Sequence, residues 1–209
     1  MSRQARFISL EGGEGVGKTT NLTFVEQYLR GHGLEVIRTR EPGGTPLGEK
    51  VRSLLLDSTH MDSRAELLLV FAARTQHIAD VIRPALDAGH WVLCDRFTDA
   101  SYAYQGGGRG IESSVIGFLE RWVQQGVQPD LTLLLDAPPA VGLARARNRG
   151  TADRFELEQL SFFENVRQAY LDRAAAQPQR IKRVDASASL EEVQNELARQ
   201  LDHLIESSR

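Results

Sequence analysis

Short apolar segments alternate along the chain with longer segments in which apolar residues recur every three or four positions. The short segments are typical of buried strands, and they predict strands at Phe7–Leu10, Val36–Thr39, Trp91–Cys94, Leu131–Leu135 and Ile181–Val184. Strands that alternate with helices form βαβ units, whose right-handed crossovers build a parallel sheet covered on both faces. The pattern therefore predicts an α/β fold with a parallel sheet.

The longer segments predict amphipathic helices. Three apolar stripes have helical spacing, and they consist of Leu22, Val25 and Leu29, of Ile111, Val115, Phe118 and Trp122, and of Leu190, Val193, Leu197, Leu201 and Leu204. A further long helix begins near Ser63, and its apolar face carries Leu67, Val70, Phe71, Ile78, Val81 and Ile82. Ser189 and Glu192 have the spacing of a capping box, which places the start of the last helix.

Composition limits the class of protein. The 209 residues are 41% hydrophobic and 25% charged, and no repeat or proline-rich linker divides them, so we expect a single domain over residues 1–209. A formal net charge of −3 argues against a strong general affinity for nucleic acid or an anionic membrane. The longest apolar run, Leu67 to Ala73, is far shorter than the roughly 20 residues of a membrane span. The single cysteine, Cys94, and the lack of an apolar signal segment near Met1 lead us to expect a cytoplasmic protein.

The clearest chemical motif is a glycine-rich loop between the first predicted strand and the first predicted helix. It has the spacing of a P-loop, in which backbone N–H groups and the start of a helix surround phosphates. Lys18 can reach the β- and γ-phosphates of ATP, and the Thr19 hydroxyl can ligate Mg²⁺. We expect ATP to contact Gly12, Gly13, Glu14, Gly15, Val16, Gly17, Lys18, Thr19 and Thr20. The chain lacks an Asn-Lys-x-Asp motif for reading guanine, which favours a small-molecule kinase over a regulatory GTPase.

Residues near other predicted strand ends imply a second substrate, because ligands of parallel sheets bind at the carboxyl ends of the strands. Asp95 can position Mg²⁺ or its water, and Arg96 can hold a phosphate, although Asp-Arg pairs also form surface ion pairs. Arg74 lies on an apolar helical stripe, where it needs either a ligand or a structural salt bridge. Phe71, one turn earlier, can stack on a base or belong to the core.

Arginines gather after the helix that is predicted to start near Pro139. Arg145 and Arg147 can form its solvated face, whereas Arg149 and Arg154 fall in the predicted loop. An arginine that closes over the site can stabilise charge on a moving phosphoryl group and exclude water. We therefore expect a lid segment at about residues 145–155.

Two glycine-rich segments complete a pattern that resembles the bacterial thymidylate kinase family. The resemblance rests on the P-loop, Arg40-Glu-Pro-Gly-Gly-Thr45, Asp95-Arg96 and Tyr104-Gln-Gly-Gly-Gly-Arg-Gly110, and it covers nearly the whole chain. It implies a three-layer P-loop NTPase fold with five parallel strands, and a homodimer. It also implies Mg²⁺-dependent phosphoryl transfer from ATP to dTMP, which gives ADP and dTDP for dTTP biosynthesis.

The same resemblance implies roles for single residues, all numbered here by their positions in this chain. Arg96 holds the dTMP phosphate, while Thr19 and Asp95 organise Mg²⁺, partly through water. Thymine meets Arg74 at a carbonyl, Phe71 on the ring face, and either Ser101 or Gln105 at its N3 edge. The sugar meets Tyr104 at its 2′ position and Glu14 near its 3′-hydroxyl, and the dTMP pocket also includes Glu41 and Pro42.

The expected catalytic residues are Lys18, Arg96, Arg149 and Glu14. Because no arginine stands inside the P-loop before Lys18, the resemblance assigns that cation to the lid, at Arg149. Two alternatives stay open from the sequence. One is a nucleoside monophosphate kinase acting on another base, and the other is a nucleotide-binding switch without turnover.

Overall fold

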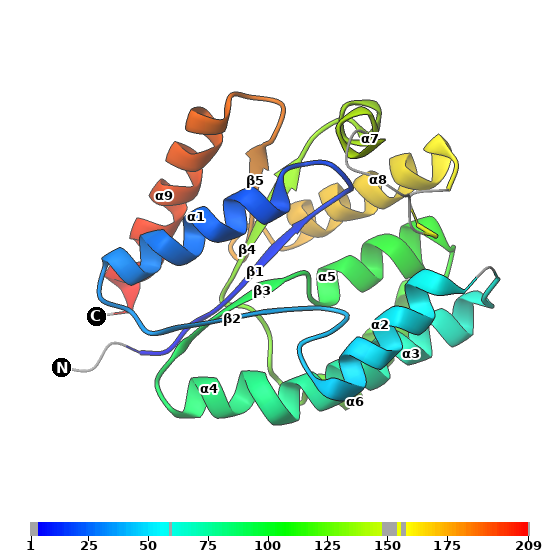
Figure 1. The fold of residues 1–209 in the computed structure, drawn as a ribbon, viewed down its shortest axis with the longest axis horizontal. Helices are drawn as coiled ribbons and strands as arrows, with labels where there is room; N and C mark the ends of the chain where they lie inside the picture. The colour runs from blue at the N-terminus through cyan, green and yellow to red at the C-terminus, as the bar shows by residue number, and fades with distance from the viewer. Residues whose placement is uncertain (1–3, 59, 148–153, 156–157, 209) are drawn as a thin grey trace.

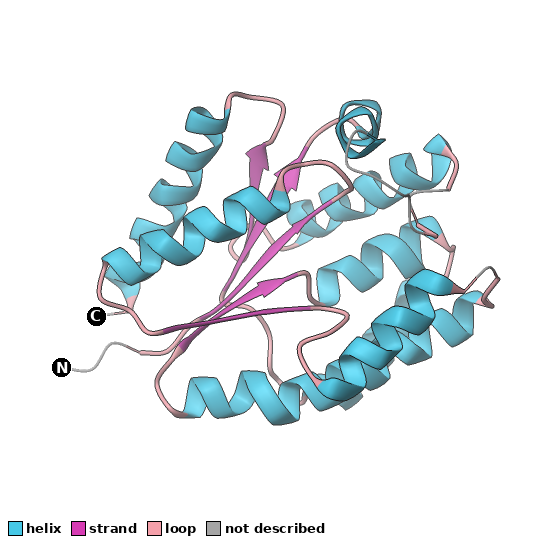
Figure 2. Ribbon diagram, viewed as in Figure 1, coloured by secondary structure: helices cyan, strands magenta, loops and turns pink. Residues whose placement is uncertain are grey.

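Five parallel strands form the centre of the fold, and each lies where the hydrophobic pattern predicts it (Figures 1 and 2). The computed structural model describes residues 4–58, 60–147, 154–155 and 158–208, without the side chains of residues 146–147. The strands are β1 (Phe7–Gly12), β2 (Val36–Arg40), β3 (Trp91–Asp95), β4 (Leu131–Asp136) and β5 (Ile181–Asp185). Each strand continues one or two residues beyond its predicted end, because the backbone ladder does not stop at the first polar side chain.

The strand order in the sheet is β2-β3-β1-β4-β5. Strand β1 lies in the middle, with Leu10 opposite Asp95 of β3 and Gly12 opposite Leu135 of β4. All of these pairings are parallel, so the carboxyl ends of the strands meet at one edge of the sheet. The predicted fold class is confirmed, and the edge where ligands bind in such sheets is defined.

Helices cover both faces of the sheet (Figure 1). Those of the first half are α1 (Lys18–Gly31), α2 (Pro46–Asp57), α3 (Ser63–His77), α4 (Arg83–Asp87) and α5 (Thr98–Ser101), with the π-helical turn η1 (Ile78–Ile82) joining α3 to α4. Those of the second half are α6 (Ser113–Gln124), α7 (Pro139–Arg147), α8 (Leu160–Ala176) and α9 (Leu190–Ser207), with a second π-helical segment, η2 (Tyr102–Gly108), after α5. None of the helices in the described ranges is long and apolar enough to cross a membrane.

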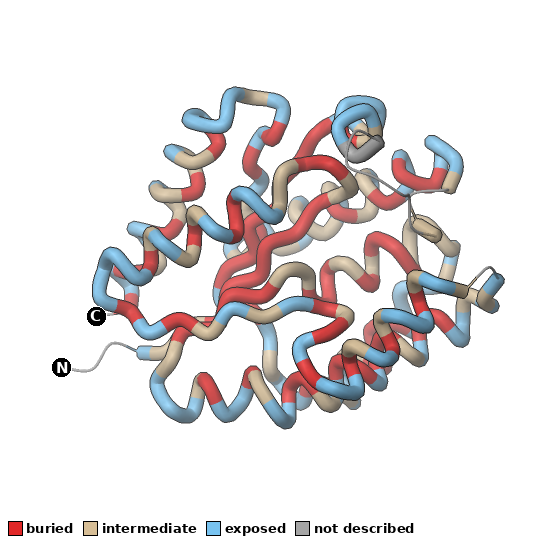
Figure 3. Tube along the Cα trace, in the orientation of Figure 1, coloured by how far each residue is buried: buried red, intermediate tan, exposed pale blue. Residues whose placement is uncertain are grey.

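The period of two along each strand divides the core into two sides, and Figure 3 shows the central strands β1, β3 and β4 as buried along nearly their whole length. On one side, Ile8 and Leu10 of β1 pack with apolar residues of α1 and α9, in one cluster with Leu22, Val25, Leu29, Val193, Leu197, Leu201 and Ile205. On the other side, Phe7 packs with Val92, Cys94, Ile78 and Ile82. Ser9 and Glu11 share this second side, which places a buried carboxyl group directly behind the ligand edge.

The expected apolar stripe of α6 does not face the core. Phe118 and Trp122 are 59% and 68% exposed, Val115 is exposed as well, and Ile111 precedes the helix. The buried positions of α6 are instead Ile116, Gly117, Leu119 and Gln124. The helix is apolar around more than one face, and spacing alone does not reveal which face packs inward. In α9 the capping box of Ser189 and Glu192 is confirmed, whereas Leu190 is exposed and Ile205 takes the buried position expected for Leu204.

Candidate active site

A cavity of about 320 Å³ opens at the carboxyl ends of β1, β2 and β3. Many of the residues expected to bind the two nucleotides line it, namely Glu14, Gly15, Val16, Gly17, Lys18, Thr19, Glu41, Pro42, Arg74, Asp95, Arg96, Ser101, Tyr104 and Gln105. Gly12 and Gly13 line a smaller cavity behind the P-loop instead. Asp136, at the end of β4, binds Arg167 and Arg183 through its carboxylate, so that strand end belongs to the scaffold.

The P-loop joins β1 to α1, and its lysine lies folded back onto the loop. Lys18 Nζ donates to the carbonyl oxygens of Gly12 at 3.1 Å and Gly13 at 2.7 Å. Burial lowers the pKa of Lys18 to about 8, and the neighbouring positive charge of Arg96 acts in the same direction. Carboxylates around the site oppose this change only in part. The protonation of Lys18 therefore depends on whether an anion, such as a phosphate, is bound next to its ammonium group.

Helix α7 contacts the P-loop through a glycine that the sequence did not single out. A Cβ atom on Gly142 would lie 2.1 Å from the Glu14 carbonyl oxygen, and one on Gly15 would lie 1.8 Å from the Gly142 carbonyl oxygen. Gly15 also has a φ of +68°, which strains any residue with a Cβ. Both backbones can approach this closely only without side chains, so the helix that leads into the predicted lid segment is packed directly on the phosphate loop.

Arg96 has a left-handed backbone conformation with φ 67°, which is uncommon for a residue other than glycine. The next residue, Phe97, donates its backbone N–H to Glu11 at 2.6 Å. The Arg96 guanidinium donates to Glu14 at 2.6 Å and to the Tyr170 hydroxyl at 3.3 Å. These contacts hold the strained turn and bring the guanidinium to Glu14 of the P-loop, inside the cavity.

Tyr104 packs its ring against Arg96, with the guanidinium 4.6 Å from the ring centroid. Its hydroxyl donates to the Glu14 oxygen that Arg96 also binds, at 2.7 Å. Behind them, Tyr170 of α8 donates to Glu11 at 2.8 Å. Burial, together with the nearby Asp99 carboxylate, raises the pKa of Glu11 to about 8. The expected association of Glu14 with Arg96 is present, and it forms part of a buried polar network that extends to β1 and α8.

Arg74 is almost fully buried in the cavity wall, and both alternatives raised for it have a structural counterpart. Its Nε donates to Glu41 at 2.7 Å, and its Nη2 donates to the Phe97 carbonyl at 3.2 Å and the Ser101 hydroxyl at 3.1 Å. Its Nη1 is buried without a hydrogen-bond partner among the described residues. The arginine thus has a structural salt bridge, and its Nη1 nitrogen remains for a ligand.

The expected role of Phe71 as a stacking surface for the base is not supported. Phe71 packs in the core with Leu67, Ile116 and Leu119, and it is not among the residues that line the cavity. Its ring lies beneath the Arg74 guanidinium, 4.6 Å from it. The residue of α3 that does line the cavity one turn before Arg74 is Val70. Helical spacing placed Phe71 on the correct side of α3 but not at the cavity surface.

Ser101 and Gln105 both line the cavity and are both already oriented by neighbours. The Ser101 hydroxyl accepts from Arg74, which leaves its own proton to be donated elsewhere. The Gln105 amide nitrogen donates to the buried carboxylate of Glu66 at 2.8 Å, so its carbonyl oxygen is directed away from Glu66. The two residues therefore offer a donor and an acceptor to the same cavity.

The residues expected to hold Mg²⁺ fit that ion. One carboxylate oxygen of Asp95 is buried without a hydrogen-bond partner among the described residues, and Asp95 lines the cavity together with Thr19. Buried carboxylate oxygens rarely lack a partner, and hydrated Mg²⁺ prefers such oxygen ligands. Within the part of the chain that the structure describes, no group of three or more His, Cys, Asp or Glu side chains could hold a metal ion by itself. Thr19 and Asp95 could contribute one or two oxygen ligands to a Mg²⁺ ion.

The arginines expected in the lid have different surroundings. Arg154 donates to the Leu55 carbonyl at 2.8 Å and to Glu66 at 2.8 Å, and Arg145 donates to the Ala186 carbonyl at 3.1 Å. Arg149 lies outside the described residues, as does the side chain of Arg147. The catalytic role expected for Arg149 stays a prediction from the sequence.

Several residues of the site were not found from the sequence. Arg52 lines the cavity and donates to the Pro42 carbonyl at 3.2 Å, but it belongs to no motif. Glu11 carries a weak signal, since it is an acid inside an otherwise apolar strand. Tyr170 lies 74 residues beyond Arg96 in the chain, and only the packing of α8 brings the two together.

A P-loop at the end of the central strand, with an arginine-lined cavity directly opposite it, defines a kinase that phosphorylates a small phosphate-bearing acceptor. The family model described as thymidylate kinase matches residues 10–197. The thymidylate kinase of Methylococcus capsulatus is 56% identical over 200 residues, which are 96% of each chain. That of Pseudomonas putida strain GB-1 is 58% identical over 205 residues, covering 97% of this chain and 98% of the relative.

Among solved structures, the thymidylate kinase of Ehrlichia chaffeensis matches with a TM-score of 0.77 at 34% identity, over 94% of this chain and 98% of that one. The chain belongs to the thymidylate kinase family. The resemblance inferred from the P-loop, the Glu-Pro-Gly-Gly-Thr segment and the Asp-Arg pair is confirmed.

Proposed function

We propose that this protein transfers the γ-phosphoryl group of ATP to dTMP, giving ADP and dTDP as a step toward dTTP. The observation that carries the proposal is one cavity lined by two sets of phosphate-binding groups, Lys18 and Thr19 of the P-loop and Arg96 after β3. A triphosphate on the P-loop and a monophosphate on Arg96 would place their phosphates face to face.

The transfer proceeds in line and without a covalent enzyme intermediate. An oxygen of the dTMP phosphate attacks the γ-phosphorus, and the bond from that phosphorus to the bridging oxygen of ADP breaks. The attacking oxygen is already anionic, so the reaction needs no strong general base. Lys18 and Arg96 neutralise the charge that spreads over the phosphoryl oxygens, and Arg149 is proposed to supply a further cation. Thr19 and Asp95 would hold Mg²⁺, partly through water, and the ion would supply positive charge to neutralise the phosphates of ATP.

Selection of thymine is proposed to rest on the hydrogen-bonding groups of the cavity wall. The unpartnered Nη1 of Arg74 can donate to a thymine carbonyl. The Gln105 carbonyl oxygen can accept from the N3–H of thymine, since Glu66 already binds the amide nitrogen. The Ser101 proton remains to be donated to a second acceptor on the base. This arrangement suits the carbonyl and N–H pattern of thymine, whereas cytosine presents an amino group at the same edge.

Selection of the sugar is proposed to rest on Tyr104. Its ring is fixed between Arg96 and Glu14, so it cannot move aside without breaking the hydrogen bond to Glu14. A 2′-hydroxyl on the acceptor would meet this ring. We therefore expect deoxyribonucleotides to be preferred for steric reasons.

The activity is tested by measuring acceptor-dependent ADP release from ATP with dTMP, dUMP, UMP, CMP, GMP and AMP. We expect the highest kcat/KM with dTMP. A clear preference for another base would contradict the thymidylate assignment while leaving a nucleoside monophosphate kinase. ATP binding without turnover on any of the six acceptors would contradict a kinase altogether. Lys18→Ala, which removes a phosphate-binding cation, serves as the control for contaminating kinases.

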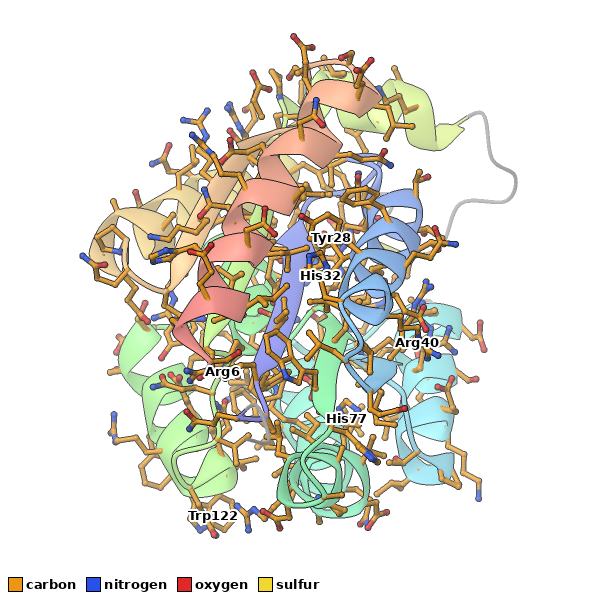
Figure 4. All side chains as sticks on the ribbon, turned by 90° about the vertical axis from the view of Figure 1, so that its left-hand side faces the viewer. Arg6, Tyr28, His32, Arg40, His77 and Trp122 are labelled. Carbon is orange, nitrogen blue, oxygen red and sulfur yellow. The ribbon has the colours of Figure 1, made fainter. Side chains whose placement is uncertain are left out.

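We further propose that the protein acts as a homodimer through α2, α3 and α6, which pack side by side (Figure 1). Large apolar side chains are exposed on all three helices: Leu54 on α2, Leu68 on α3, and Val115, Phe118 and Trp122 on α6. Trp122 projects from the edge of the molecule in Figure 4. A symmetric pair of copies would cover these side chains. The proposed use of ATP and dTMP agrees with the cytoplasmic location expected from the sequence. Analytical ultracentrifugation of the wild-type protein should show a dimer. Phe118→Asp should dissociate it, whereas Leu190→Asp, at a similarly exposed position on α9, should leave it intact. A wild-type monomer would refute the interface.

A further inference from the structure

A chain of four polar side chains runs from β2 to the cavity wall behind the proposed base site. It consists of Thr39 and Glu41, at the end of β2, and Arg74 and His77, one turn apart on α3. Glu41, Arg74 and His77 are buried, with 4%, 1% and 0% of their surfaces exposed. Figure 4 shows His77 between the sheet and the helix viewed nearly end-on below it. Polar groups this deeply buried are costly unless each finds a partner, so their arrangement is informative.

Each link of the chain is a short hydrogen bond. Thr39 Oγ1 lies 2.6 Å from His77 Nε2, and His77 Nδ1 lies 2.9 Å from Glu41 Oε1. The other carboxylate oxygen, Glu41 Oε2, accepts from Arg74 Nε at 2.7 Å. Both oxygens of Glu41 are thus engaged by side chains on α3. Although Glu41 lines the cavity, its carboxylate serves Arg74 and His77, which differs from the direct contact with dTMP expected from the sequence.

This chain of hydrogen bonds determines the direction of Nη1, the guanidinium nitrogen of Arg74 without a partner among the described residues. A guanidinium is planar, so anchoring Nε and Nη2 also fixes Nη1. Nη2 is anchored by Phe97 and Ser101, and Nε is anchored only by Glu41. The terminal torsion of a glutamate is broad, so a carboxylate held at one oxygen can rotate. His77 holds the second oxygen and prevents that rotation.

The neighbouring loop is built to accommodate this histidine. A Cβ atom on Gly44 would lie 2.6 Å from Thr39 Oγ1 and 2.7 Å from His77 Nε2, and Gly44 has a φ of +76°. Only glycine fits there without displacing the Thr39–His77 pair. The Glu-Pro-Gly-Gly-Thr segment therefore packs its second glycine on the outer end of the chain and its glutamate on the inner end.

We infer that His77 is a positioning residue for base recognition, acting through Glu41 to aim Arg74 Nη1 at the acceptor base, with Thr39 fixing the histidine. The inference rests on the proposed function, since it names which residues set the specificity of that site. His77 is not among the residues that line the cavity. Its loss should therefore weaken recognition of the base and leave ATP binding and the chemical step largely unchanged.

The test compares two amide replacements of the same histidine in the full-length chain. In His77→Asn the amide nitrogen lies close to the position of Nδ1 and can still donate to Glu41. In His77→Gln the amide reaches the position of Nε2, so it keeps the contact with Thr39 and loses the one with Glu41. We expect His77→Gln to raise KM for dTMP about tenfold, as for the loss of a hydrogen bond to a charged group, with kcat and KM for ATP near wild type. His77→Asn should stay close to wild type in all three.

Base discrimination gives a readout that a purely structural role would not change. Thymine and 5-methylcytosine differ only at the 4-carbonyl and N3 edge, so dTMP and 5-methyl-dCMP report on the groups proposed to read this edge, which include Arg74 and Gln105. The wild-type preference for dTMP in kcat/KM should fall about tenfold in His77→Gln, because a mobile guanidinium no longer favours a carbonyl. Thr39→Val, which removes the hydroxyl, should lower the preference for dTMP by a smaller factor. Thr39→Ser, which keeps the hydroxyl, should retain the wild-type preference. This second pair keeps the test valid if His77→Gln does not fold.

Two results would overturn the inference. One is an unchanged preference for dTMP over 5-methyl-dCMP in both His77→Gln and Thr39→Val. The other is a rise in KM for ATP as large as that for dTMP, which would mean general loosening of the fold. Either result, obtained with a wild-type protein that phosphorylates dTMP, leaves the proposed function intact. A wild-type protein that does not use dTMP contradicts the proposed function itself.

Discussion

The charge of Lys18 should depend on whether ATP is bound, and the structure allows the size of this effect to be worked out. In the free protein burial lowers the pKa of Lys18 to about 8. The phosphates of ATP bring negative charge next to the ammonium group, which raises the pKa of Lys18 again. Binding above neutral pH must therefore be accompanied by proton uptake.

The expected uptake follows from the fraction of neutral lysine in the free protein. With a pKa of about 8, that fraction is about 0.1 at pH 7, about 0.5 at pH 8 and about 0.9 at pH 9. At each pH, the number of protons taken up per bound nucleotide should equal this fraction. Because the neutral lysine must first be protonated, the Kd for the nucleotide should be about tenfold higher at pH 9 than at pH 7.

Isothermal titration calorimetry measures this uptake directly. The Mg²⁺ complex of a non-hydrolysable ATP analogue is titrated at each pH in two buffers with different ionisation enthalpies, and the difference in observed heat gives the protons exchanged. Lys18→Arg is the matched control, because a guanidinium keeps both its charge and its proton over the whole range. Uptake that does not change between pH 7 and pH 9, or that persists unchanged in Lys18→Arg, would refute the assignment of the proton to Lys18.

Three further predictions concern other parts of the site. Arg149→Ala should lower kcat by at least about a hundredfold in a steady-state assay while the melting temperature is kept; unchanged turnover would remove Arg149 from the mechanism. Tyr104→Ala should narrow the preference for dUMP over UMP, which differ only in the 2′-hydroxyl, and Tyr104→Phe, which keeps the ring and loses the hydrogen bond to Glu14, should narrow it less; equal preference in all three proteins would show that the ring does not select the sugar. Gly142→Ala should lower kcat/KM for ATP about tenfold, because its Cβ would lie 2.1 Å from a P-loop carbonyl, and Gly31→Ala, where a Cβ meets nothing within 4 Å, should be neutral; a wild-type value for Gly142→Ala would mean that the contact is not needed.

The fold was predictable because its signals are local. Each strand is a short apolar run, and each strand end that faces the cavity carries a recognisable group, such as the P-loop after β1 or Asp95 at the end of β3. The P-loop in particular combines spacing, glycine content and strand-helix context in one segment. These features identified the class of protein and most of the cavity before any contact was known.

What the sequence did not reveal depends on how helices rotate and which distant segments meet. Phe71 and Val70 are neighbours on α3, and only the packing of α6 decides that Phe71 lies in the core and Val70 in the cavity wall. Similarly, Tyr170 reaches Arg96 and Glu11 because α8 crosses behind the P-loop, which no spacing encodes. His77 is a further case, since a histidine at helical spacing carries no sign of its contact with Glu41.

The central claim is that one cavity holds a triphosphate and a monophosphate at the same time and passes a phosphoryl group directly between them. A single-turnover reaction tests it most directly, with the enzyme in excess over ATP labelled in its γ-phosphate, and with dTMP present. We predict that the label moves to the terminal phosphate of dTDP, with one ADP formed for each dTDP and no label on the protein. Label recovered on the protein or as inorganic phosphate, with dTMP unchanged, would contradict the account.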